Sequence, residues 1–322
     1  MFDVVLYSVL GTFYVLVVLS QMLVVILENR QPVKTVAWLM VLFFLPVVGL
    51  VLYFFFGRNR KREHFVSRAC AAQLARRSAV RFYQGGFPDL PPEHEPLIKL
   101  FRRQSGAFPY ADNKIRFFVS GQEMLDNLLR DIAAARHHIH VEFYIIEDDC
   151  VGRMVREALA AKAREGVSVR LVYDDVGCWN VKDKFFKEMS DAGIEVHAFL
   201  KVAFPVFTSK VNYRNHRKIV VIDGKVGFMG GMNIADRYTK GTSWGTWRDT
   251  HFKIIGKGVH GLQAAFLIDW YVVSKKLLNE KIYYPPLPVY SDDNIMQICT
   301  SGPVGQWRTL LQAAIFTVAN AK

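Results

Sequence analysis

The stretch HIHVEFYIIEDDCVGRMVREALAAKAREGVSVRLVYDD (138–175) decides the fold class. Its first residues alternate between polar and apolar and are followed by a continuous apolar run, which is typical of a buried strand. Its end, VSVRLVYDD (167–175), is a second such segment. Between them, residues 151–165 carry apolar side chains at helical spacing and stop at Gly166. Strand, helix and strand in this order predict an α/β unit, because a helix of this length can return the chain to begin a parallel strand.

The same alternation continues on both sides of this stretch. A strand and turn, IRFFVSG (115–121), and a helix over residues 122–136 come before it. A helix over residues 182–192 and a strand, IEVHAFL (194–200), come after it. Strands that alternate with helices are typical of parallel sheets. We therefore expect an α/β domain with a mostly parallel sheet over residues 111–290.

Residues 1–57 differ in kind from the rest of the chain. Two charge-free runs, from Val4 to Leu27 and from Thr35 to Gly57, are separated only by ENRQPVK (28–34). Each is long enough for a membrane-crossing helix, which needs about 20 residues. A cleaved signal peptide fits poorly, because the first residues lack a basic region and the first run is too long. We expect two transmembrane helices in residues 1–57; a pair of buried core helices is the alternative.

The charge distribution indicates an anionic partner and an orientation. The chain has 41 Lys and Arg residues against 29 Asp and Glu residues, which suits phospholipid headgroups, phosphorylated substrates or nucleic acid. Between residues 57 and 86, eight basic residues stand against one acid, Glu63. The positive-inside rule places this segment and all that follows in the cytoplasm, and the segment could also contact anionic lipid. We assign residues 58–110 to a basic juxtamembrane segment and a linker that includes QGGFPDLPPEHEP (84–96).

An internal repeat indicates a second unit. The segment IRFFVSGQEMLDNLLRDIAAAR (115–136) is similar to MQICTSGPVGQWRTLLQAAIFTVANAK (296–322) in its strand, its Ser-Gly step and its amphipathic helix with a Leu-Leu pair. We therefore expect residues 291–322 to be the beginning of a second α/β repeat, truncated at Lys322.

Candidate reacting groups lie in NHRKIVVIDGKVGFMGGMN (215–233). His216 and Lys218 are two residues apart, so on an extended backbone both project to the same face. Asn233 follows two glycines and can cap a helix or offer its amide to an anion. Together the three side chains could form a phosphate site with a nucleophile or base, a fixed cation and a neutral donor. A structural histidine on a strand is the alternative.

Asp223 lies at the other end of the same strand. It begins the sequence Asp-Gly-Lys between two apolar runs, which is a hairpin signal. Asp223 therefore sits at the far tip, and we expect it to brace the turn rather than to touch a substrate.

The pattern H-x-K-x4-D, followed by six residues and G-G-x-N, resembles the HKD motif of the phospholipase D superfamily. Together with the segments FFLPVVGLVLYFFFGRN (43–59) and RNHRK (214–218), it makes the chain similar to bacterial cardiolipin synthases over its whole length. The resemblance implies that His216 attacks a phosphodiester and forms a phosphohistidine, and that Asp249 in WRDTHF (247–252) orients it. It also implies a second HKD histidine that protonates the leaving group.

Residues 1–322 contain no second H-x-K-x4-D pattern. A second HKD half would come from the rest of a longer chain or from a dimer partner. The resemblance implies a multi-pass protein of the cell membrane that transfers a phosphatidyl group from one phosphatidylglycerol to another, giving cardiolipin and glycerol. It implies no cofactor, no metal and no nucleic-acid partner.

Three alternatives stay open at this point. One is a phospholipase D-type phosphodiesterase that hydrolyses lipid or nucleic acid, although two membrane spans favour lipid. Another is a catalytically incomplete half-enzyme. The third is a non-catalytic membrane protein that binds anionic lipid through residues 57–86.

Two polar groupings have metal-binding alternatives. In HHIHVE (137–142), alternation places His138, His140 and Glu142 on one face, which suits zinc only if the strand bends. Polar residues leading into the catalytic strand explain the pattern as well. Asp174 and Asp175 end a strand, where acids near a carboxyl-end crevice are common, and nothing else indicates magnesium there.

Two tryptophans lie just before Asp249. Trp244 and Trp247 stand beside Gly241 and Gly245. They could line a lipid entrance or pack under a loop.

Overall fold

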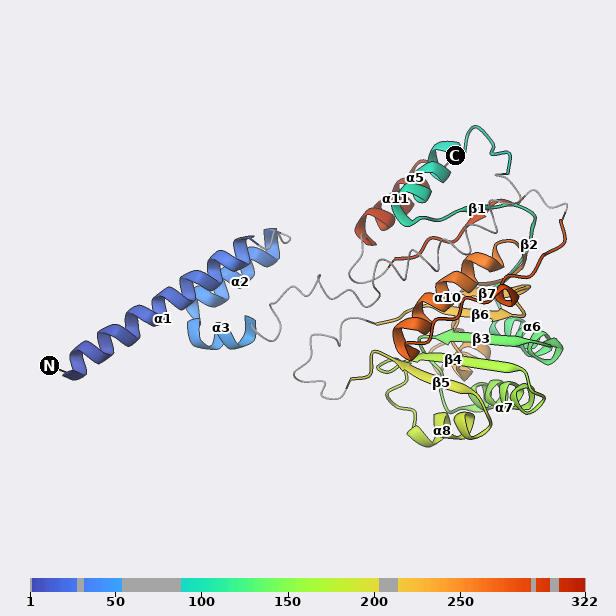
Figure 1. The fold of residues 1–322 in the computed structure, drawn as a ribbon, viewed down its shortest axis with the longest axis horizontal. Helices are drawn as coiled ribbons and strands as arrows, with labels where there is room; N and C mark the ends of the chain where they lie inside the picture. The colour runs from blue at the N-terminus through green and yellow to red at the C-terminus, as the bar shows by residue number, and fades with distance from the viewer. Residues whose placement is uncertain are drawn as a thin grey trace. The chain divides into compact units, whose positions relative to one another are not determined.

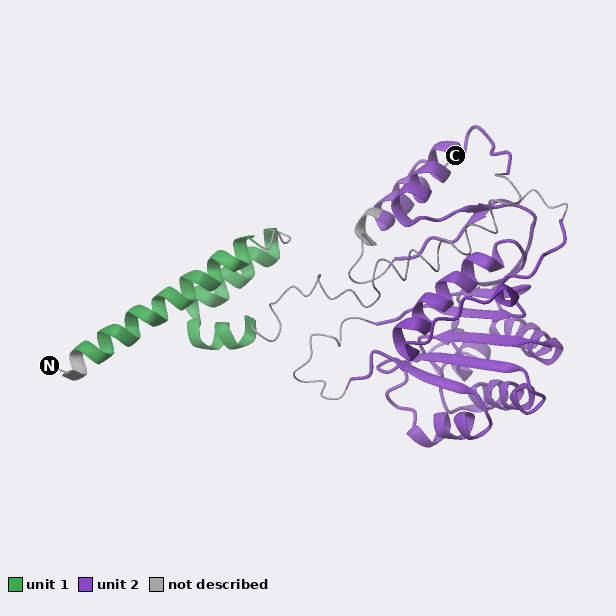
Figure 2. Cartoon of the chain, viewed as in Figure 1, with its two compact units in different colours: residues 1–63, 203–212 green, residues 64–202, 213–322 purple. Residues whose placement is uncertain are grey.

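The computed structural model describes residues 2–27, 32–53, 88–202, 214–290, 294–301 and 307–321. The basic segment 57–86 lies outside the described residues. The chain forms two compact units, residues 1–63 with 203–212 and residues 64–202 with 213–322 (Figure 2).

The first unit contains the helices α1 (Phe2–Leu27), α2 (Pro32–Phe44) and α3 (Pro46–Leu52). Within the described residues, only the segment Val5–Leu27 of α1 is a single helix long and apolar enough to cross a membrane, with a mean hydropathy of 2.4. The second predicted span is interrupted at Leu45, whose φ of −132° and ψ of 63° are not helical. The following proline causes this, because its ring disfavours the helical conformation of the residue before it. The prediction of two membrane spans stays a prediction.

The second unit is built on a seven-stranded sheet with the order β2-β8-β7-β6-β3-β4-β5 (Figure 1). The strands are β2 (Asn113–Phe118), β3 (His138–Phe143), β4 (Ser168–Asp174), β5 (Glu195–Phe199), β6 (Lys218–Ile222), β7 (Val226–Gly230) and β8 (His251–Gly256). The helices are α5 (Glu95–Ser105), α6 (Gly121–Ala134), α7 (Cys150–Arg164), α8 (Asp183–Asp191), α9 (Asp236–Lys240), α10 (Val259–Ser274) and α11 (Trp307–Ala319). The short strands β1 (Pro109–Tyr110) and β9 (Met296–Gln297) pair separately, and a 3-10 turn covers Lys281–Tyr283.

The prediction of a mostly parallel sheet is wrong, because the sheet is mixed. Only β3–β4 and β4–β5 are parallel, and the pairs β2–β8, β8–β7, β7–β6 and β6–β3 are antiparallel. Helical crossovers account for the parallel part. The antiparallel part begins at β6 and turns at Asp223 and Gly224, whose φ angles are 53° and 64°. Two successive positive φ angles are typical of the tight hairpin turn that the Asp-Gly pair predicts.

Helices cover both faces of the sheet, with α6, α7 and α8 on one side and α10 on the other (Figure 1). The residues of β6 show this division. Val220 and Ile222 belong to the core under α6 and α7, while Ile219 and Val221 pack with Leu262 of α10. Because both faces are buried, β6 reads as a continuous apolar run instead of an alternating one.

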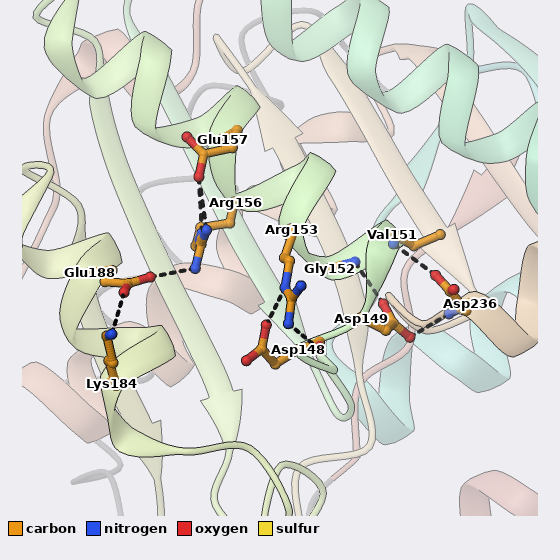
Figure 3. A network of polar contacts seen from close by, with 10 residues as sticks. All are labelled: Asp148, Asp149, Val151, Gly152, Arg153, Arg156, Glu157, Lys184, Glu188 and Asp236. Carbon is orange, nitrogen blue, oxygen red and sulfur yellow. Dashed lines mark hydrogen bonds and ion pairs between the residues drawn. The ribbon is translucent and has the colours of Figure 1, made fainter.

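A polar network joins the beginning of α7 to the beginning of α9 (Figure 3). The Asp149 carboxylate caps α7 by accepting the Gly152 N–H at 2.9 Å, and it also accepts the Asp236 N–H at 2.6 Å. Asp236 in turn accepts the Val151 N–H at 2.8 Å. These reciprocal caps fix the end of the segment that follows β7, which carries the Gly-Gly-Met-Asn part of the motif.

The two copies of the sequence repeat lie in different environments. On α6, the side chains of Met124, Leu125, Leu128 and Ile132 are buried. On α11, which lies beside α5, the apolar side chains of Leu311, Ile315, Phe316 and Val318 are between 51% and 77% exposed. The region 296–319 does have a strand followed by a helix, and its reading as a second repeat stays a prediction.

Candidate functional site

The candidate site lies at one edge of the sheet, where strands of opposite direction meet. Parallel strands β3, β4 and β5 end at this edge. Antiparallel β6 begins there, because Phe143 at the end of β3 is paired with Lys218 at the start of β6. The end of β7 and the start of β8 lie at the same edge, since Gly230 is paired with His251. His216, Lys218 and Asp249 are thereby brought together.

His216 presents an exposed imidazole against the Lys218 ammonium. The Nζ atom of the largely buried Lys218 lies 3.1 Å from His216 Nδ1 and 3.3 Å from Nε2, and it donates a hydrogen bond to the His216 carbonyl at 2.9 Å. Tyr144, the residue after β3, completes the group: its ring centre is 4.5 Å from that of His216 and 5.3 Å from Lys218 Nζ. Sequence analysis missed Tyr144, although its place directly after β3 is a usable signal.

The electrostatics of the pair favour a neutral imidazole beside a cation. Partial burial and the Lys218 charge lower the pKa of His216, while the charges of Asp174 and Asp249 oppose this. Burial lowers the pKa of Lys218 to about 8, again against the charge of Asp249. At neutral pH the ring is therefore unprotonated and able to act as a nucleophile, and Lys218 is charged.

Asp249 lies close to this pair and is held by backbone. Its Oδ1 accepts the Thr250 N–H at 2.7 Å. A methyl group added to Gly231 would come within 2.0 Å of that same oxygen, so the glycine leaves the space that the carboxylate fills. The carboxylate contributes a negative charge to both His216 and Lys218.

Asn233 is placed differently from the phosphate donor that the sequence predicts. It is 4% exposed, its Oδ1 accepts the Ile145 N–H at 3.1 Å and its Nδ2 donates to the Tyr238 hydroxyl at 2.6 Å. The Oδ1 atom thus ties the chain after β7 to the segment that follows β3, and the Nδ2 atom ties it to α9. A contact between Asn233 and phosphate stays a prediction.

Asp223 lies at the opposite end of β6 from His216. Its carboxylate accepts the backbone N–H groups of Arg136, His137 and His138 at 2.7–2.9 Å. Burial raises the pKa of Asp223, but these donors outweigh it and bring the pKa below its ordinary value. The contacts are those of a brace between the hairpin and the start of β3.

The described residues contain no group of three or more His, Cys, Asp or Glu side chains that could hold a metal ion. His138 and His140 face α10, where both bond to Gln263, and burial lowers the pKa of each. Asp174 accepts the N–H groups of Val176, Gly177 and Asn215, and Asp175 accepts that of Val202. These side chains are occupied by internal hydrogen bonds.

A buried histidine next to Lys218 was missed by sequence analysis. Of the described residues none bonds either ring nitrogen of His251, and burial, with the Lys218 charge, lowers its pKa to about 3. The sequence signal would have been the WRDTHF segment itself, in which His251 begins β8.

The two tryptophans separate into different environments. Trp247 packs beside Tyr238, with ring centres 5.8 Å apart, and lies near Arg237. Trp244, at a tight turn between Thr242 and Gly245, is 94% exposed. The packing interpretation holds in part for Trp247, which is still 48% exposed, and does not hold for Trp244.

Comparison with known proteins gives matches along nearly the whole chain. Residues 128–243 match the family described as "Cardiolipin synthase, PLD-like domain", and residues 12–58 match "Phospholipase_D-nuclease N-terminal". A cardiolipin synthase of Alkalihalophilus pseudofirmus is 37% identical over 97% of this chain and 64% of its own length. The major cardiolipin synthase ClsA of Bacillus subtilis is 35% identical over 97% of this chain and 67% of its own length.

This chain spans about 64% of the length of the first of these relatives. Among solved structures, NucT from Helicobacter pylori is similar with a TM-score of 0.40 and 17% identity, over 50% of this chain and 98% of that one. With the matched domains and the identity to these relatives, the chain belongs to the cardiolipin synthase family of the phospholipase D superfamily.

Proposed function

We propose that this chain carries one HKD half-site of a cardiolipin synthase, which transfers a phosphatidyl group from one phosphatidylglycerol to another and releases glycerol. The observation that carries the proposal is the exposed His216 imidazole, with a lowered pKa, beside the Lys218 ammonium 3.1 Å away. A neutral nucleophile next to a fixed cation suits attack on an anionic phosphodiester, because the cation stabilises the charge of the phosphoryl oxygens in the transition state.

In the proposed first step, a ring nitrogen of His216 forms a bond to the phosphorus of phosphatidylglycerol. The bond from phosphorus to the headgroup glycerol breaks, and glycerol leaves with a proton from a general acid. In the second step, a hydroxyl of another phosphatidylglycerol attacks the phosphohistidine, loses its proton and releases His216. The phosphorus–nitrogen bond conserves the energy of the diester, so no ATP is required.

The other groups at the edge have supporting roles in this proposal. Lys218 holds phosphoryl oxygens, Asp249 orients His216, and Asp223 stabilises the hairpin. The Asn233 amide either donates a hydrogen bond to phosphate or holds the segment after β7 against Ile145. If the second motif provides the nucleophile, His216 acts instead as the general acid and base, a role for which an imidazole is suited because it can both accept and donate a proton.

A second HKD half is required to protonate the leaving group. We propose that it comes from the rest of a longer chain or from a second copy. The exposed apolar side chains of α11 support this, because the sequence repeat matches α11 to α6, whose corresponding face is buried against a sheet. A second sheet over α11 would remove that apolar surface from water.

We also propose that the protein is anchored by two spans, with the candidate site in the cytoplasm. The apolar helix α1 supports the first span. Helices α2 and α3 together cover residues 32–52, a length that suits a second span with a bend at Leu45. The basic residues of the segment 57–86 support the orientation.

A product assay tests the proposed function. The purified chain in detergent is incubated with phosphatidylglycerol, beside His216→Ala and the control His94→Gln, which changes an exposed histidine at the start of α5. Cardiolipin and glycerol from the chain and the control, but not from His216→Ala, would support the proposal. Phosphatidic acid with free glycerol would indicate hydrolysis, and no product even after a second HKD half is supplied would contradict the proposed synthase activity.

A further inference from the structure

Alternation along the segment RNHRK (214–218) divides its side chains between two sides of the chain. His216 and Lys218 face the candidate site. Asn215 and Arg217 point the other way, toward α10, where their polar groups meet Asp269. Among the residues that the structure describes, Lys218 alone bonds to the side chain of the exposed His216, so the position of the imidazole depends on the backbone that Asn215 and Arg217 hold.

The anchoring side contains two buried carboxyl groups. Glu142 on β3 is 1% exposed and Asp269 on α10 is 7% exposed. Glu142 is paired with Ile219 on β6, which packs against α10, so its side chain lies on the same face of the sheet as Asp269. Both accept hydrogen bonds from the one Asn215 amide group, with Asp269 at 3.2 Å.

Asn215 is the centre of this cluster. Its Nδ2 bonds to both carboxyl groups, its Oδ1 accepts the Arg217 N–H at 3.1 Å, and its own N–H donates to Asp174 at 2.8 Å. The Arg217 guanidinium bonds to Asp269, and its other nitrogen reaches the Ser301 carbonyl at 3.3 Å. The residues on both sides of His216 are thus tied to three elements, β3, β4 and α10.

The charge balance of the cluster indicates that one carboxyl group keeps a proton. Two ionised carboxylates and one guanidinium would leave a net negative charge in a buried space, which is costly. Burial raises the pKa of Glu142 well above its ordinary value, the Asp269 charge adds to this, and the Arg217 charge opposes it. A neutral Glu142 beside an Asp269–Arg217 ion pair avoids both the cost of burying a second ionised carboxylate and a net negative charge in the cluster.

We propose that Glu142 and Asp269 are positioning residues: through Asn215 and Arg217 they hold the backbone that places His216 against Lys218. The inference concerns the geometry of His216 itself, and its catalytic consequence rests on the proposed function. It predicts that an uncharged hydrogen-bonding side chain at position 142 keeps His216 in place, while an apolar side chain of similar size does not.

The variants Glu142→Gln and Glu142→Leu test this prediction in the full chain. The control is Glu195→Leu, which removes a carboxylate at the opposite edge of the sheet, bonded to Arg170 and Lys276. The first measurement is the pH dependence of His216 carbethoxylation by diethylpyrocarbonate, followed at this residue by peptide mass spectrometry. It requires no enzyme activity.

In the wild type and in Glu142→Gln, the midpoint should lie below 6.5, since burial and the Lys218 charge lower the pKa of His216. In Glu142→Leu it should rise by about half a pH unit or more, because His216 moves away from Lys218 while Asp174 and Asp249 keep their charges. Glu142→Leu should remain folded, because a neutral carboxyl group is replaced by an apolar side chain and the Asn215 amide keeps Asp269 as an acceptor.

The second measurement is cardiolipin formation, where Glu142→Leu should lower kcat about 100-fold with little change in KM, and Glu142→Gln should recover most of that loss. An unchanged His216 midpoint in folded Glu142→Leu would overturn the inference. If that variant does not fold, Asn215→Ala, which removes the amide bonded to both carboxyl groups, takes its place with the same expected rise in the midpoint. A wild type that makes no cardiolipin even with a second HKD half supplied would contradict the proposed function alone, because the carbethoxylation result would still decide the inference.

Discussion

An added methyl group at Gly231 should lower the reaction rate while leaving the free energy of unfolding nearly unchanged. The Cβ atom of an alanine there would lie 2.0 Å from Oδ1, 2.5 Å from Cγ and 2.6 Å from Oδ2 of Asp249. Ordinary contact begins at about 3.4 Å, so the nearest carboxylate oxygen must move by about 1.4 Å. The φ of Gly231 is outside the left-handed region, so the backbone accepts alanine.

The expected cost falls on the rate of the reaction. Asp249 is only partly buried and its side chain can rotate, so we expect the free energy of unfolding to change by less than about 1 kcal/mol. A displacement of about 1 Å at a catalytic constellation can lower the rate about 100-fold. Such a loss corresponds to about 2.7 kcal/mol of transition-state stabilisation.

The assay is cardiolipin formation by Gly231→Ala, Asp249→Ala and the double variant, with urea unfolding of each. If Gly231→Ala acts through Asp249, the double variant should be no slower than Asp249→Ala alone. Gly230→Ala is the matched contrast, because its methyl group would meet the backbone of Thr250 and His251 and should lower stability instead. Additive losses in the double variant, or an unaltered rate in Gly231→Ala, would refute the reasoning.

Three further predictions follow from the same geometry. Burial lowers the pKa of Lys218 to about 8 from an ordinary 10.5, so between these pH values the folded state binds fewer protons than the unfolded state, and the free energy of unfolding should rise with pH. Lys218→Met should abolish both this rise and the activity, which urea titrations at several pH values and the lipid assay would measure. Asp223→Ala should lower the free energy of unfolding by about 1–3 kcal/mol at neutral pH, because three backbone N–H groups lose their acceptor. This stability difference should vanish as the pH falls through the lowered folded-state pKa of Asp223, and Asp223→Asn should recover part of the lost stability. A lower reaction rate without a loss of stability would instead assign Asp223 to the chemistry. Trp244→Ala should leave the melting temperature unaltered, since the side chain is 94% exposed, and it should slow the reaction on phosphatidylglycerol vesicles if Trp244 contacts lipid. If the variant is as fast as the wild type on vesicles as well as on short-chain soluble substrate, that contact is excluded.

The local elements of the second unit could be predicted because each carries its own signal. The helices at 122–136 and 151–165 have a strong apolar period, and the hairpin at Asp223 has a turn pair that requires positive φ. Strand direction carries no such signal. Residues 219–222 form a uniformly apolar run that suits either neighbour direction, so the expectation of a mostly parallel sheet was wrong.

The candidate site was predicted where spacing alone places groups together. His216 and Lys218 meet because they are two residues apart on an extended chain. Asn233 has the expected position in the chain, but its bonds to Ile145 and Tyr238 depend on elements distant in sequence. The same holds for Glu142 and Asp269, which lie 127 positions apart and meet only because β3 and α10 pack face to face. Periodicity could mark each as polar at an apolar position, but it could not pair them.

The mixed direction of the sheet is what makes this site. In open α/β sheets, ligands bind beyond the carboxyl ends of the parallel strands, at the point where the strand order reverses. Here that reversal is the β3–β6 pair: β6 runs against β3, so its first residue, Lys218, lies beside Phe143 at the carboxyl end. Had β6 run parallel to β3, Lys218 would lie at the opposite edge, beside the brace that Asp223 now provides, and His216 would be far from Tyr144 and Asp174. The antiparallel return that the sequence failed to predict is therefore the feature that brings a motif histidine to the edge where a phosphodiester can reach it.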